Sequence, residues 1–140
     1  MLEIDKYFLK YRNLCRKIST KETELEELQE KTIGAVGYNE KTSSSHSPKG
    51  LEQREIQLEN LQDTIKILYE KKEKRKSKHI ADFEKLSKPE YKIILTNYYL
   101  DFVTIKKISI KMDKSIGHIK KLKREALNEL LKVVIKKQNT

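Results

Sequence analysis

The chain lacks tryptophan and is poor in cysteine, proline and glycine, with one, two and four of them among its 140 residues. The single cysteine, Cys15, excludes a disulfide within the chain. No run of roughly 18 apolar residues and no signal-peptide pattern is present, so we expect a cytoplasmic protein without a membrane span. Because proline and glycine interrupt helices, their scarcity favours an all-α fold.

The sequence also lacks the residue patterns of enzymes and metal sites. Its three histidines, His46, His79 and His118, are far apart, and with one cysteine they give no zinc-binding spacing. There is no phosphate-binding loop, no nucleophile elbow and no pair of carboxylates in an apolar setting. We therefore expect a protein that is not an enzyme and that needs no cofactor or metal.

Positive charge is abundant but unevenly distributed. The net charge is +10, and residues 88–140 hold 13 Lys or Arg against 5 Asp or Glu, which gives +8 for this part alone. A basic C-terminal part favours a polyanionic partner such as double-stranded DNA, although solvated lysine faces give the same composition. Hydrophobic residues make up 36% and charged residues 37%, which is typical of half-exposed helices that each bury one stripe.

Residues 2–31 carry a heptad pattern. Apolar residues recur seven apart in two rows, with Lys21 as the polar exception, which predicts an amphipathic helix about 40 Å long. The rows are Ile4, Tyr11, Ile18 and Leu25, and Tyr7, Leu14 and Leu28. The pattern stops at residues 33–50, which are rich in Ser, Gly and Pro and predict a mobile loop.

Residues 51–79 predict a second long helix, which ends in a charged stretch over residues 71–78 that is either helical or a hinge. Its rows are Leu51, Leu58 and Ile65, and Leu61 and Leu68. One apolar stripe cannot stabilise either helix alone, so we expect an antiparallel hairpin over residues 1–79. Intramolecular packing and dimerisation through the hairpin account for the stripes equally well.

Residues 80–140 predict a small helix-turn-helix domain. Ser87 and Glu90 have the spacing of a capping box before a helix over residues 88–100, and a turn over residues 101–103 follows. Thr104 caps a short helix that ends at Met112, and Ser115 caps a long one that runs to about residue 136. The predicted core is Ile93, Ile94, Ile105, Ile108, Met112, Ile119 and Leu122.

The segment from Thr104 to Ser115 resembles the helix-turn-helix in the fourth region of bacterial sigma factors. A Thr cap is followed by a small residue five positions on and by a Ser cap, and the apolar frame continues after it. The frame consists of Ile119, Leu122, Ala126, Leu127 and Leu130. Asp113 stands where that family has a turn glycine, but Asp tolerates left-handed geometry. Lys114 replaces an apolar residue, and Gly117 lies in the first turn of the second helix.

The whole chain is similar to the ArpU/RinA-like late-gene regulators of phages. That group joins a helix of the Leu9–Arg12 type, a Ser/Pro/Gly-rich loop and a second long helix to a sigma-like C-terminal domain. The resemblance implies a sequence-specific, DNA-binding transcriptional regulator that activates phage late genes. Such a protein would be associated with the nucleoid in the cytoplasm of a bacterial host cell. For such a regulator, we expect the N-terminal helices to serve in dimerisation or in contact with host RNA polymerase.

The resemblance also implies the residues that contact DNA. Base edges would be read by the exposed first two turns of the last helix, and phosphates would be bound farther along it and on the preceding helix. The residues for base edges are Ile116, Gly117, His118, Lys120 and Lys121, those for phosphates are Lys106, Lys107, Lys123 and Arg124, and the caps Thr104 and Ser115 complete the site. Tyr98 and Tyr99 have helical spacing that indicates packing rather than stacking on bases.

Two other functions are compatible with this pattern. Small terminase subunits also join a helix-turn-helix to long oligomerising helices, but theirs is usually N-terminal and they form rings. Alternatively, the hairpin itself sequesters a protein, in which case Lys120 and Lys121 are dispensable.

Overall fold

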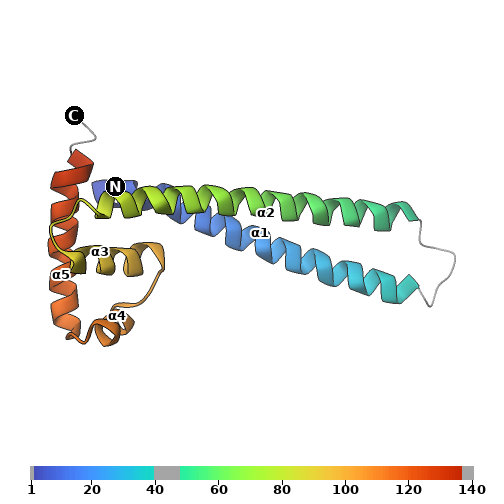
Figure 1. Ribbon diagram of the computed structural model, residues 1–140. Coiled ribbons are helices and arrows are strands. Elements are labelled where there is room, and N and C mark those ends of the chain that lie inside the picture. Colours follow the sequence, from blue (N-terminus) through green and yellow to red (C-terminus); the bar gives the residue numbers. More distant parts are fainter. Residues whose placement is uncertain (1, 40–47, 137–140) are drawn as a thin grey trace. The chain divides into compact units, whose positions relative to one another are not determined.

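The computed structural model of the protein describes residues 2–39 and 48–136, and the side chains of residues 2–31 and 50–136. The fold is all-α, as predicted: a long helical hairpin precedes a small C-terminal cluster (Figure 1). The helices are α1 (Glu3–Asn39), α2 (Pro48–Phe83), α3 (Pro89–Leu95), η1 (Thr96–Leu100), α4 (Ile105–Met112), α5 (Ile116–Leu130) and η2 (Leu131–Ile135). None of the described helices has an apolar stretch that could cross a membrane.

Helices α1 and α2 run antiparallel, which confirms the predicted hairpin (Figure 1). Both are longer than predicted, because residues 33–39 continue α1 and residues 48–50 begin α2. The predicted loop over residues 33–50 is therefore wrong at both ends, and its centre, residues 40–47, lies outside the described residues. Gly34 and Gly37 each cost a helix only about 1 kcal/mol, too little to end it, and Pro48 occupies a first-turn position that tolerates proline.

The chain forms two compact units. Unit 1 consists of Met1–Arg12 and Glu73–Thr140, and unit 2 of Asn13–Lys72. The sequence predicted a domain border at residue 79. Unit 1 also includes residues before that border, namely residues 73–79 and the first turns of α1.

Aromatic contacts tie the first turns of α1 into unit 1. The Phe8 ring is fully buried and stacks on Tyr99, with 4.3 Å between ring centroids and an interplanar angle of 3°. The Tyr11 hydroxyl donates a hydrogen bond to the Leu100 carbonyl (2.7 Å), and the Tyr7 hydroxyl donates one to the Asp82 carboxylate (2.6 Å). Residues at opposite ends of the chain therefore share one core.

The core of the C-terminal helices largely agrees with the prediction. Ile94, Ile108, Ile119 and Leu122 are buried, and Ile105 and Met112 are half-buried. Ile93 is 44% exposed, so its assignment to the core is wrong. Helix α3 buries the stripe formed by Tyr91, Ile94 and Leu95, and Ile93 lies on the helix face beside this stripe.

The predicted capping box at the start of α3 is also wrong. The N-cap is Lys88, which makes no side-chain capping hydrogen bond, and Pro89 follows it in the first turn. The Ser87 hydroxyl instead donates to the Glu129 carboxylate of α5 (2.8 Å). A contact between distant segments thus replaces the local one that the spacing predicted.

The predicted helices over residues 88–100 and 115–136 are present, but each ends in a π-helical turn, η1 and η2. Residues 101–103 form the expected turn, in which the Val103 amide donates to the Asn97 carbonyl (2.8 Å). Phe102 adopts φ 55°, a left-handed conformation unusual for an aromatic residue. Its ring lies 6.1 Å from that of Tyr11, centroid to centroid.

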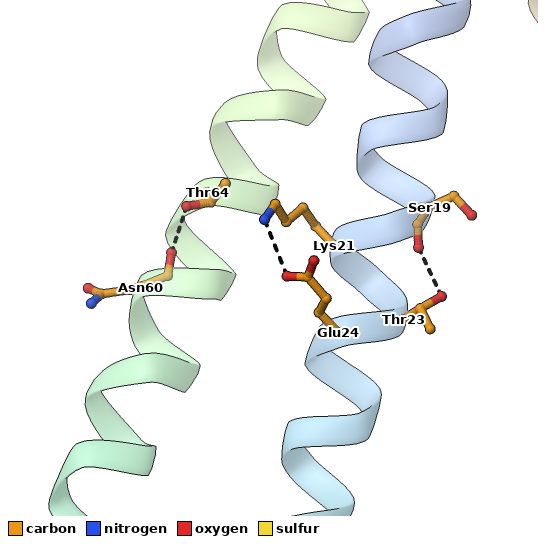
Figure 2. Close-up of polar contacts among 6 residues, drawn as sticks. All are labelled: Ser19, Lys21, Thr23, Glu24, Asn60 and Thr64. Carbon is orange, nitrogen blue, oxygen red and sulfur yellow. Dashed lines mark hydrogen bonds and ion pairs between the residues drawn. The ribbon is translucent and has the colours of Figure 1, made fainter.

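Unit 2 has little core. Leu14 and Ile18 are its only buried side chains among residues 13–31 and 50–72. Figure 2 shows polar contacts that each join residues of the same helix: Lys21 with Glu24 (3.2 Å), Thr23 with the Ser19 carbonyl (3.0 Å) and Thr64 with the Asn60 carbonyl (2.9 Å). These contacts support the individual helices. Between α1 and α2, apolar side chains pack together and the Tyr69 hydroxyl donates a hydrogen bond to Glu22 (3.1 Å).

Candidate nucleic-acid interface

A tight turn joins α4 to α5. Asp113 ends α4 in the left-handed conformation (φ 53°, ψ 49°), as predicted for the position where sigma factors have glycine. The Lys114 amide donates to the Ser109 carbonyl (3.1 Å), and the Ser109 hydroxyl donates back to the Lys114 carbonyl. Ser109 is the small residue five positions after the Thr104 cap, and these bonds fix the geometry of the turn.

Both predicted helix caps are confirmed. The Thr104 hydroxyl accepts a hydrogen bond from the Lys107 amide (3.3 Å), and the Ser115 hydroxyl accepts one from the His118 amide (3.1 Å). Each cap satisfies an amide that would otherwise lack a partner in the first helical turn. The two hydroxyls that the sequence predicted to contact DNA therefore have a structural role.

One face of α5 anchors it in unit 1. Ile119, Leu122, Ala126 and Leu130 are buried, and α5 contacts both α3 and α4. The Tyr91 hydroxyl donates to Glu125 (2.9 Å), and this bond raises the pKa of Tyr91. With Glu129 bonded to Ser87, both carboxylates of α5 are held on the side of α3.

The opposite surface at the start of α5 is exposed and basic. The exposed predicted residues of α5 are Ile116, Gly117, His118, Lys120, Lys121 and Arg124, and those of α4 are Lys106 and Lys107. Residues 103–124 contain eight Lys or Arg, and Asp113 is their only acidic residue. The charged residues of the helix-turn-helix are therefore nearly all positive.

Lys123 is less exposed than the other predicted phosphate ligands. Its ammonium nitrogen is 3.9 Å from the centroid of the Tyr98 ring and 5.5 Å from that of Tyr99, a cation–π arrangement that leaves the side chain half-buried. Tyr99 is buried, which raises its pKa to about 12. Both tyrosines pack within unit 1, as their helical spacing predicted.

The sequence prediction missed several residues at this surface. Lys111, which is exposed, and Lys114, which is half-exposed, add positive charge, and their place beside the turn could have identified them. A hollow of about 470 Å³ also adjoins α5, with Ile4 and Leu127 among its apolar lining and Arg124 at its edge. Nothing in the sequence indicated that Ile4, near the other end of the chain, lies there.

The histidines and carboxylates of the described residues do not gather into a metal site. No three His, Cys, Asp or Glu side chains within residues 2–31 and 50–136 are grouped to hold a metal ion. His79 is buried among aromatic rings and His118 is exposed, while His46 lies outside the described residues.

No protein-family model, no curated protein and no solved structure matches this chain. The resemblance to sigma factors and to phage late-gene regulators therefore stays a prediction from the residues themselves.

Proposed function

We propose that this protein is a sequence-specific DNA-binding transcriptional regulator that inserts the first two turns of α5 into the major groove. The observation that carries the proposal is the helix-turn-helix itself, with a rigid turn, two capped helices and eight cations against one carboxylate over residues 103–124. An α-helix with its side chains is about 10–12 Å wide, which fits the major groove of about 12 Å.

The exposed side chains of α5 suit base recognition. Lys120 and Lys121 can donate to the O6 and N7 acceptors of guanine, and the Ile116 side chain can contact a thymine methyl group. Arg124, Lys106 and Lys107 are placed for phosphates, whereas Lys123 contributes less because its ammonium group already lies over Tyr98. The resemblance adds that the targets are phage late promoters and that host RNA polymerase is a second partner.

The proposal is tested by replacing Lys120 and Lys121 with alanine. If both contact phosphates, DNA binding weakens and the slope of log K against log salt falls by about two, roughly one per lost contact. The measurement is a titration of fluorescent duplexes, selected from random and phage-derived pools, at several salt concentrations.

The matched control is Lys74→Ala with Lys78→Ala, which removes the same charge from exposed positions of unit 1 outside residues 103–124. The control should bind DNA like the unchanged protein. An unchanged slope with altered sequence preference would support the assignment of Lys120 and Lys121 to base edges, and no effect on either quantity would refute the proposed function.

Replacing Gly117 with alanine should separate folding from DNA binding. A Cβ atom at this position meets no atom within 4 Å, so the free protein should gain up to about 1 kcal/mol of stability. The same methyl group should weaken DNA binding, because the start of α5 approaches the bases closely. Thermal unfolding and duplex titration measure the two effects, and unchanged affinity would show that Gly117 does not approach the DNA.

A further inference from the structure

The two ends of unit 2 carry opposite charge. We call residues 13–21 and 68–72 the proximal half, and residues 22–31 and 50–67 the distal half. On α1 the proximal half has three basic residues and no carboxylate, whereas the distal half has five glutamates and one lysine. The basic residues are Arg16, Lys17 and Lys21, and the glutamates are Glu22, Glu24, Glu26, Glu27 and Glu30.

Helix α2 repeats this division. Its distal half has four carboxylates and two basic residues, and its proximal half has one carboxylate and two basic residues. The two helices are in register, because the Tyr69 hydroxyl bonds to Glu22 (3.1 Å) and because Leu28 and Leu61 line the same hollow. The net charge is therefore +4 in the proximal half and −6 in the distal half.

The apolar seam of the distal half is not closed by the hairpin. Beyond Ile18 no described side chain of unit 2 is buried. The apolar side chains left half-buried there are Leu25, Leu28, Leu51, Leu58, Leu61 and Ile65. Ile56 and Ile67 are 56% and 52% exposed, and a hollow of about 440 Å³ opens between the helices. Such a surface is stabilised when further helices cover it.

We propose that unit 2 pairs with unit 2 of a second copy of this chain, antiparallel and with two-fold symmetry, to form a four-helix arrangement. An antiparallel pair places the −6 half of each copy against the +4 half of the other, and the symmetry makes this contact twice. A parallel pair would place like charges together. Any other protein would need a positive patch opposite the distal half and a negative patch opposite the proximal half. A second copy of this chain in the antiparallel orientation has this pattern.

The pairing uses only unit 2 and does not depend on DNA binding. Its charges are mostly exposed, so salt should weaken the association, because the Debye length falls from about 10 Å at 0.1 M to about 3 Å at 1 M. The apolar seam should preserve part of the affinity at high salt.

Charge reversal in the full chain tests the pairing. One variant carries Glu24→Lys and Glu27→Lys, and the other carries Arg16→Glu and Lys17→Glu. Each alone places like charges against like at the substituted positions and reduces the charge of one half, from −6 to −2 or from +4 to 0. Each should therefore weaken self-association about tenfold or more, measured by sedimentation equilibrium. In an equimolar mixture the mixed dimer keeps one unchanged contact and places opposite charges at the substituted positions of the other. It should therefore regain association to within a few-fold of the unchanged protein.

The control variant, Lys106→Glu with Lys107→Glu, lies in unit 1 and should associate normally while losing DNA binding, so the two proposals fail independently. A monomeric unchanged protein, or a mixture that stays as weak as its components, would overturn the pairing. Circular dichroism of each variant establishes that the helices are retained.

The lone cysteine reports the orientation. Cys15 lies in the proximal half, so in an antiparallel pair it faces the partner's distal half. Cysteines introduced singly in place of Glu26, Gln29 or Glu30 should yield a disulfide to Cys15 of the other copy, which requires Cα atoms within about 7 Å. A disulfide between two Cys15 residues in the unchanged protein would indicate a parallel pair and contradict the proposal.

Discussion

Replacing Phe8 with alanine should lower the free energy of unfolding of unit 1 by about 3–5 kcal/mol, the usual cost of removing a buried aromatic ring. Phe8 is fully buried and stacks on Tyr99, and its ring also lies 5.2 Å from His79 and 6.2 Å from Phe83 between centroids. Its loss leaves a cavity among aromatic rings that cannot collapse without moving α1. This is a large fraction of the roughly 5–15 kcal/mol by which native proteins are stable.

Hydrogen exchange of the α5 amides measures the opening of unit 1 separately from that of unit 2. We expect their protection to fall sharply in the Phe8→Ala variant, and DNA binding to weaken with it. Leu2→Ala is the control, since Leu2 is 73% exposed in the same N-terminal segment and should cost under about 0.5 kcal/mol. A Phe8→Ala variant with unchanged protection would show that the C-terminal helices fold without α1.

Acid should destabilise unit 1 through His79. This side chain is fully buried, and neither ring nitrogen has a hydrogen-bond partner among the described residues. Burial, with Arg75 and Lys78 nearby, lowers the pKa of His79 from 6.5 to about 4, although Asp82 opposes the shift. Between these pH values the unfolded chain binds a proton at His79 that the folded chain does not. The contribution of His79 to the free energy of unfolding is therefore fully present above pH 6.5 and is lost as the pH falls towards 4. The full loss is about 3 kcal/mol.

Urea unfolding at a series of pH values measures this loss. In the His79→Leu variant the change between pH 6.5 and pH 4 should largely disappear, because the titrating group is gone. At pH 7 the variant should be nearly as stable as the unchanged protein, since leucine removes two unpaired polar atoms from an apolar site. His118→Leu is the control, because His118 is exposed and should leave the pH dependence intact. An unaltered pH dependence in His79→Leu would assign the loss to other groups.

Local signals in the sequence were sufficient for the helices and for the turn of the candidate site. The apolar rows of residues 2–31 and 51–79 predicted the hairpin, and Thr104 and Ser115 predicted the starts of α4 and α5. Asp113 identified the turn, because few other residues adopt its left-handed conformation. Each of these features depends on residues within a few positions of one another.

Features that depend on distant residues were missed. Ser87 has the spacing of a capping box, but Glu129 of α5 provides a better partner for it than the local Glu90. Ile93 is apolar yet exposed, because the neighbouring stripe of α3 already faces the core. The positions of Lys123 over Tyr98 and of Ile4 beside α5 follow from tertiary packing that no local pattern specifies.

Unit 1 is built from the two ends of the chain, which has a consequence for the order of folding. Its hydrogen bonds from Tyr7 to Asp82 and from Tyr11 to Leu100 join residues 75 and 89 positions apart. Closing so long a loop in a flexible chain costs about 4 kcal/mol of entropy, a cost that slows folding. The hairpin removes most of this cost, because α1 and α2 each continue from unit 2 into unit 1 and their pairing brings the two segments together. During synthesis, the N-terminal turns of α1 can pack only after the C-terminal helices have been made. We expect formation of the α1–α2 hairpin to limit the rate at which unit 1 folds.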